Sequence, residues 1–137
     1  MSRQKNYAIK SKKEVKSAKP AETPLAVIGT VAIDSVETPF GKRERVFGGS
    51  ASYFSYAASF FTPVALVAVV GKDFPEEYRR VLEERPIDQS HLEVVEGKTF
   101  AWKGKYESDL NTAHTLDTQL NVLLQFNPKL HFEHRPD

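Results

Sequence analysis

Two continuous apolar runs constrain the fold of this chain more than any other feature. The first covers residues 25–33 and the second residues 64–70, and neither alternates between apolar and polar side chains. Strands buried on both faces, as in the parallel sheets of α/β proteins, have this pattern. Helical patterns over residues 50–61 and 73–86 follow the two runs, and residues 92–95 form a third short apolar strand. The order β-α-β-α-β predicts a parallel sheet with right-handed crossovers.

Two further segments have the pattern of a flap rather than of a core. Residues 34–45 are polar and contain Pro39 and Gly41, which predicts a hairpin. Residues 99–106 alternate between apolar and polar side chains, which predicts a half-exposed antiparallel strand. We expect residues 119–126 to return as the strand that pairs with it.

A pair of glycines, Gly48 and Gly49, opens the first predicted helix, with Ser50 or Ser52 as its expected N-cap. Residues without a Cβ let a ligand approach the backbone, and the helix directs free N–H groups and its positive dipole end at that place. Asp34 lies at the carboxyl end of the first apolar run, the edge where open parallel sheets bind ligands. A carboxylate beside exposed N–H groups suits a ligand rich in hydroxyl groups.

Composition excludes several classes of protein. A chain of 137 residues with 40% hydrophobic residues can bury one modest core, and the absence of cysteine excludes disulfides and thiolate chemistry. No apolar run is long enough to span a bilayer, so we expect a cytoplasmic protein with no membrane partner. Residues 1–24 hold seven basic and two acidic residues and are predicted to be a disordered basic tail. The remaining residues are mildly acidic, which makes nucleic acid an unlikely partner, and the scattered histidines predict no metal site.

The motifs along residues 25–126 resemble the N-terminal portion of PfkB/ribokinase-type carbohydrate kinases. The matching segments are VIG at residues 27–29 with Asp34 beyond it, GGSA at residues 48–51 opening an alanine-rich helix, and VAVVGKDF at residues 67–74. Their order and spacing make the resemblance more specific than a glycine pair alone.

Membership would imply a ribokinase-like three-layer α/β/α fold with a parallel central sheet and a small β lid. Residues 25–137 would form its N-terminal half, lid strands included. It would also imply ATP- and Mg²⁺-dependent phosphorylation of a hydroxyl group on a sugar or nucleoside. By this resemblance the substrate-binding residues are the hydroxyl-binding aspartate, the diglycine, the residue that replaces the family's usual Asn, and two lid aromatics: Asp34, Gly48, Gly49, Tyr53, Phe100 and Trp102.

The resemblance does not extend to the catalytic machinery. The family's catalytic base lies in a late Gly-Ala-Gly-Asp-like motif, which this sequence does not contain, and its ATP-binding residues also come late. We therefore expect a truncated, inactive kinase with the substrate side only, no catalytic residue, and weak binding of ATP or Mg²⁺. The alternative is a non-catalytic module with a ribokinase-like half-fold, which binds a ligand or forms a homodimer through its lid strands. A Rossmann dinucleotide domain is disfavoured, because no G-x-G-x-x-G follows the first apolar run.

Overall fold

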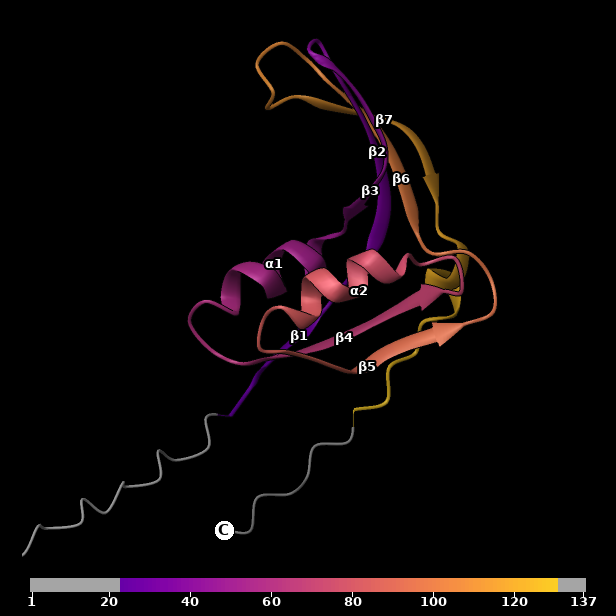
Figure 1. Ribbon diagram of the computed structural model, residues 1–137. Helices are drawn as coiled ribbons and strands as arrows, with labels where there is room; N and C mark the ends of the chain where they lie inside the picture. The colour runs from indigo at the N-terminus through magenta and orange to yellow at the C-terminus, as the bar shows by residue number, and fades with distance from the viewer. Residues whose placement is uncertain (1–22, 131–137) are drawn as a thin grey trace, which may run out of the picture.

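A parallel sheet forms the base of the molecule. The computed structural model describes residues 23–130, so the tail predicted over residues 1–24 lies almost wholly outside the described residues. Three strands, β1 (Leu25–Ile28), β4 (Val64–Gly71) and β5 (Ile87–Val95), pair in the order β1-β4-β5, and both pairings are parallel (Figure 1). The parallel sheet expected from the continuous apolar runs is therefore confirmed.

Helices α1 (Ser50–Ala58) and α2 (Glu76–Glu83) lie on the same face of this sheet (Figure 1). The central strand β4 is buried at all but one of its eight positions, which explains its unbroken apolar sequence. Its alternate residues share the main core with residues of both helices: Val64, Leu66, Ala68 and Val70 with Ala51 and Leu82. Neither of these helices, nor any other in the described part of the chain, is long and apolar enough to cross a membrane.

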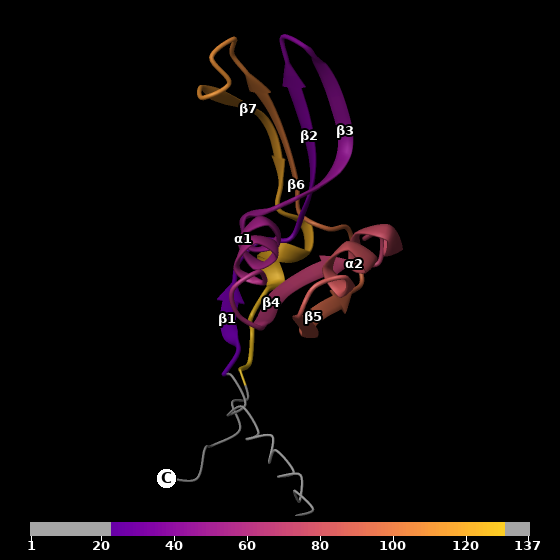
Figure 2. The ribbon, with the colours of Figure 1, turned by 60° about the vertical axis from the view of Figure 1, so that its left-hand side comes forward.

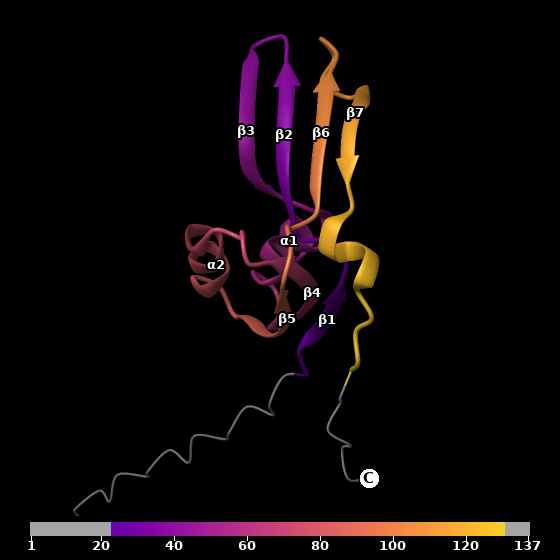
Figure 3. The ribbon, with the colours of Figure 1, turned by 90° about the vertical axis from the view of Figure 1, so that its right-hand side faces the viewer.

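A second sheet rises from the base and is called the lid here (Figure 2). Its strands are β2 (Ala32–Thr38), β3 (Gly41–Gly48), β6 (Ala101–Tyr106) and β7 (Ala113–Gln119), in the order β3-β2-β6-β7 (Figure 3). The β2–β3 and β6–β7 pairs are antiparallel, and β2 pairs with β6 in parallel. The hairpin predicted over residues 34–45 is confirmed, whereas β6 was expected to be antiparallel and has one parallel neighbour.

The prediction of one strand over residues 25–33 was wrong. The chain leaves the central sheet after Ile28 and enters the lid at Ala32, so Asp34 lies within the lid strand β2. The apolar residues Val31 and Ile33 are buried all the same, because they lie where the lid joins the base of the molecule. Burial at a junction between two sheets thus gives the same sequence pattern as burial between two layers.

Element boundaries differ from the predictions in three further places. Helix α1 ends at Ala58, and β5 begins at Ile87, earlier than the strand expected over residues 92–95. Helix α2 begins later than the predicted residue 73, with Pro75 at its N-cap position, and the Asp73 side chain binds Thr99 instead.

The strand predicted over residues 119–126 was also wrong. The polar residues before it form β7, and a short 3-10 helix, η1 (Asn121–Gln125), follows. Asn121 has a φ of 48°, which interrupts an extended chain, and the Val122 N–H donates to the Lys98 carbonyl at 3.1 Å. Val122 is buried, so its apolar side chain serves the junction below the lid rather than a sheet.

Candidate functional site

The candidate site lies where the lid meets the start of α1. Asp34 in β2 pairs with Val46 of β3 on one side and with Trp102 of β6 on the other. Because paired residues on adjacent strands project from the same face of a sheet, the side chains of Asp34 and Trp102 share one face of the lid. The topology therefore brings together two predicted site residues that are far apart in sequence.

The two glycines hold this arrangement in different ways. A Cβ on Gly48 would lie 2.0 Å from Oδ2 of Asp34, so the carboxylate packs directly against the Gly48 backbone. Gly49 has a φ of 97°, and a Cβ there would lie 2.4 Å from the Thr30 carbonyl oxygen. Both positions thus need glycine for the packing of the chain itself, whereas the sequence suggested room for a ligand. Their contact with substrate stays a prediction.

The Asp34 carboxylate is half-buried, and one of its oxygen atoms can accept a hydrogen bond from a ligand. Its half burial raises the pKa above the ordinary value of 3.8, and the backbone N–H groups of Gly49 and Trp102 partly offset this by stabilising the charged form. Within the described residues, the buried Oδ1 atom has no hydrogen-bond partner. A buried carboxylate oxygen without a partner is costly, so this atom is suited to accept a hydrogen bond from a ligand.

Thr30, which the sequence analysis missed, caps helix α1 from the link between β1 and β2. Its carbonyl accepts the Ala51 N–H at 2.9 Å, and its hydroxyl accepts the Ser50 N–H at 3.1 Å. The N-cap residue is Gly49, which has no side chain to cap with, and not Ser50 or Ser52 as predicted. Two of the N–H groups expected to be free for a ligand therefore have partners within the chain.

Trp102 is fixed on the lid by its neighbours. Its indole packs over Gly104, where an added Cβ would lie 1.9 Å from the ring, and its Nε1 donates to the Thr115 hydroxyl at 3.1 Å. The Tyr106 ring meets it edge-on, with 6.4 Å between centroids. The indole is half-buried and so keeps surface that a ligand can contact.

The two remaining predicted residues serve the base of the lid. Phe100 is half-buried, and its carbonyl accepts the Ile33 N–H at 2.9 Å, just before β6 begins. The Tyr53 hydroxyl donates to the Phe47 carbonyl at 3.3 Å, and its ring is largely exposed. The structure therefore links Tyr53 to β3 and shows no hydrogen bond between it and Asp34.

A partly buried polar link joins the lid to the end of β4. The Asp73 carboxylate accepts both the backbone N–H and the hydroxyl of Thr99, at 2.8 and 2.7 Å. The same hydroxyl accepts the Gly71 N–H at 3.0 Å. Asp73, the acidic residue of the VAVVGKDF segment, thus positions the start of β6. No local sequence pattern predicts this contact.

A parallel sheet with helices, a four-stranded lid above it and an aspartate at their junction define a ribokinase-like fold. The nucleoside kinase of Burkholderia thailandensis in complex with inosine superposes with a TM-score of 0.65 at 17% identity, covering 74% of this chain and 38% of that one. The nucleoside kinase of Methanocaldococcus jannaschii, an archaeal member of the ribokinase family, gives 0.63 at 20% identity, covering 80% and 42%. Ribokinase of Cryptococcus neoformans in complex with ADP gives 0.61 at 18%, covering 73% and 34%.

Sequence comparison leads to the same group of proteins. A cytidine kinase of Thermococcus kodakarensis is 35% identical over 86 residues, which are 62% of this chain and 31% of that protein. No known protein-family model matches the chain. The resemblance to PfkB/ribokinase-type kinases is thereby confirmed. The chain spans less than half the length of each of these relatives.

Proposed function

We propose that this chain supplies the acceptor-substrate side of a ribokinase-type kinase that phosphorylates a nucleoside. The observation that carries the proposal is the Asp34 carboxylate, which is packed against Gly48 and has one buried oxygen without a partner in the described residues. A ribose offers the hydroxyl donors that such an acceptor needs. The names of the similar proteins, a cytidine kinase and a nucleoside kinase solved with inosine, favour a nucleoside over a free sugar.

Trp102 is our candidate for recognition of the nucleobase. It shares the face of Asp34 in the lid, and its indole is held in place by Thr115 and Gly104. A fixed aromatic ring next to a hydroxyl acceptor can stack on a base while the carboxylate binds the sugar. A nucleoside would therefore contact both Trp102 and Asp34, whereas ribose alone would contact only Asp34.

ATP with Mg²⁺ would be the phosphoryl donor in the intact kinase, in a cytoplasmic setting. One of the similar solved structures contains ADP, which is consistent with such a donor. Among residues 23–130, no group of three or more His, Asp or Glu side chains is placed to hold a metal ion. Because the sequence contains no Gly-Ala-Gly-Asp-like motif, we assign no step of the phosphoryl transfer to the residues of this chain.

The proposal is tested by binding rather than by turnover. Isothermal titration calorimetry of the full chain should give saturable binding of inosine or cytidine and weaker binding of ribose. Asp34→Asn should weaken nucleoside binding roughly tenfold to a hundredfold, because hydrogen bonds to a charged group are strong. Asp117→Asn is the matched control: Asp117 pairs with Lys103, on the opposite face of the lid from Trp102, and is exposed. Equal binding by both variants would refute the role of Asp34.

The second candidate function is a homodimer formed through the lid. The edge strand β7 is exposed at all seven positions, and the opposite edge strand β3 is exposed at its first five. Open strand edges can pair with a second copy of the same chain. Sedimentation equilibrium would support this candidate if it gave a dimer that Thr115→Pro in β7 converts to a monomer, and a monomer at all concentrations would exclude it.

A further inference from the structure

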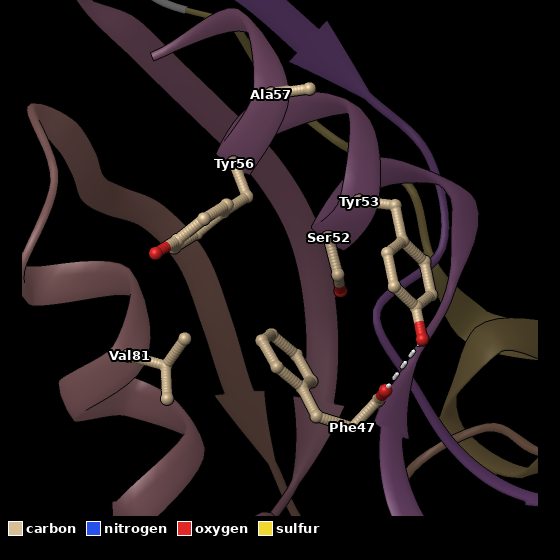
Figure 4. Close-up of a pocket in the computed structure, with 6 residues that line it drawn as sticks. All are labelled: Phe47, Ser52, Tyr53, Tyr56, Ala57 and Val81. Carbon is tan, nitrogen blue, oxygen red and sulfur yellow. Dashed lines mark hydrogen bonds between the residues drawn. The ribbon is translucent and has the colours of Figure 1, made fainter. Parts of the chain in front are cut away.

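A cavity lies between the two helices, beside the end of β3 (Figure 4). Its volume is about 360 Å³, which is at the lower end of the range for small-molecule sites. It is bounded by side chains of α1, one residue of α2 and one residue of the lid: Ser52, Tyr53, Tyr56, Ala57, Val81 and Phe47.

The walls of this cavity determine the chemistry of a ligand. None of the residues that line it carries a charge, and three contribute aromatic rings: Phe47, Tyr53 and Tyr56. Aromatic rings pack well against another ring, edge-on or offset. An ion would lose its hydration here without gaining a partner, so the cavity suits a neutral ring compound.

Ser52 gives the cavity a buried polar contact, in addition to the hydroxyl-bearing rings of Tyr53 and Tyr56. Its side chain is only 3% exposed, and its hydroxyl has no hydrogen-bond partner among the described residues. In Figure 4 the hydroxyl points from α1 into the space next to Phe47 and Tyr53. Buried hydroxyl groups normally find a partner, and a ligand in this cavity would provide one.

The cavity lies on the opposite side of the lid from Asp34, although Tyr53, one of the residues predicted to bind substrate, lines it. Phe47 and Gly48 are neighbours on β3, so they face opposite sides of the lid. Asp34 packs against Gly48, whereas Phe47 lines the cavity and stacks on Tyr78 with 5.1 Å between ring centroids. The inference therefore does not depend on the proposed kinase function.

We propose that the cavity between α1 and α2 binds a compact, uncharged aromatic molecule that carries one hydrogen-bonding group. The ring lies among Phe47, Tyr53 and Tyr56, and the polar group bonds the Ser52 hydroxyl. A serine hydroxyl both donates and accepts, so a phenol-type hydroxyl or a ring N–H meets the requirement.

Three probes test the chemistry by calorimetry on the full chain: phenol, toluene and benzoate. Phenol should bind saturably, toluene should bind more weakly because it lacks the polar group, and benzoate should not bind because it is charged. Binding of benzoate as tight as that of phenol, or no saturable binding of phenol, would overturn the proposal.

Two variants test the location. Ser52→Ala should weaken phenol binding roughly threefold to tenfold and leave toluene unchanged, since it removes one neutral hydrogen bond. Ser55→Ala is the matched control, because Ser55 lies on the same helix, is equally buried and also lacks a partner, but does not line the cavity.

Val81→Phe enlarges the side chain that points from α2 toward Phe47 in Figure 4, so it fills the cavity and should abolish binding of phenol and toluene alike. Circular dichroism of both variants verifies that the fold is intact. Unchanged phenol affinity in Ser52→Ala, or in a folded Val81→Phe, would place the ligand elsewhere and refute the site.

Discussion

The central sheet has three strands and the lid has four, and the two sheets are stabilised differently. In the central sheet, β4 is buried at all but one position and packs under two helices. In the lid, β7 is exposed throughout, and β3 is exposed along more than half its length. The central sheet therefore has its own core, whereas the lid depends on strand pairing and on its attachment at the base. A region of that second kind can adapt to a ligand.

The largest expected difference between the two regions comes from leucine truncation. Leu66→Ala in β4 removes a side chain that is 0% exposed and should cost about 2 to 5 kcal/mol of unfolding free energy. Leu116→Ala in β7 removes one that is 51% exposed and should cost less than about 1 kcal/mol. Urea denaturation measures both. Similar losses would mean that the lid has a core of its own and would remove the contrast.

Gly49→Ala tests the junction between the two regions. The new Cβ would meet the Thr30 carbonyl at a backbone with a φ of 97°, so we expect a loss of about 2 to 4 kcal/mol. Gly41→Ala is the control, because Gly41 also has a positive φ but no atom within 4 Å of the added Cβ. In thermal unfolding, the Tm of Gly49→Ala should be well below that of Gly41→Ala. The reverse order would contradict the packing described for Gly49.

Thr99→Val should loosen the lid more than the central sheet. The substitution keeps the shape but removes the hydroxyl that binds Asp73 and Gly71, at an expected cost of about 1 to 3 kcal/mol. Hydrogen exchange should show faster exchange in β6 with little change in β4. Thr118→Val, at an exposed position of β7 where the hydroxyl has no hydrogen-bond partner among the described residues, is the control and should have a much smaller effect. Uniform acceleration in both sheets would show that the link is not specific to the lid.

The smallest expected effect is the pH dependence of Asp34. Burial raises its pKa in the folded protein, so folding favours the neutral form. Its contribution to stability is therefore present below the ordinary value of 3.8 and is lost as the pH rises through the raised folded pKa. Compared with Asp34→Asn, the native protein should lose under about 1 kcal/mol between acid and neutral pH, because water still screens the half-buried group. If the native protein instead gained stability over this range relative to Asp34→Asn, the folded pKa of Asp34 would be lowered rather than raised.

Sequence patterns predicted the parts of the fold in which burial has a simple geometry. The run at residues 64–70 is apolar because β4 is covered on both faces, and this prediction was confirmed. The run at residues 25–33 has the same composition, yet Val31 and Ile33 are buried at the junction with the lid. Strand β7 has no apolar pattern because it is exposed, and so it was not predicted.

The candidate site was predictable only in part, for a related reason. The sequence predicted that the glycine pair and Asp34 lie at the same edge of the parallel sheet. The structure does place Asp34 against Gly48, although Asp34 belongs to the lid strand β2. The cap that Thr30 places on α1 and the link from Asp73 to Thr99 join residues far apart in sequence through polar atoms. Such contacts leave no periodic signal along the chain, and neither does the hydroxyl of Ser52.

The lid is tied to the base of the molecule at every one of its strands. Four links make these connections, from β1 to β2, β3 to α1, β5 to β6 and β7 to η1. Asp34 and Trp102 are paired in the two central strands of this sheet, so any displacement of the lid carries both side chains with it.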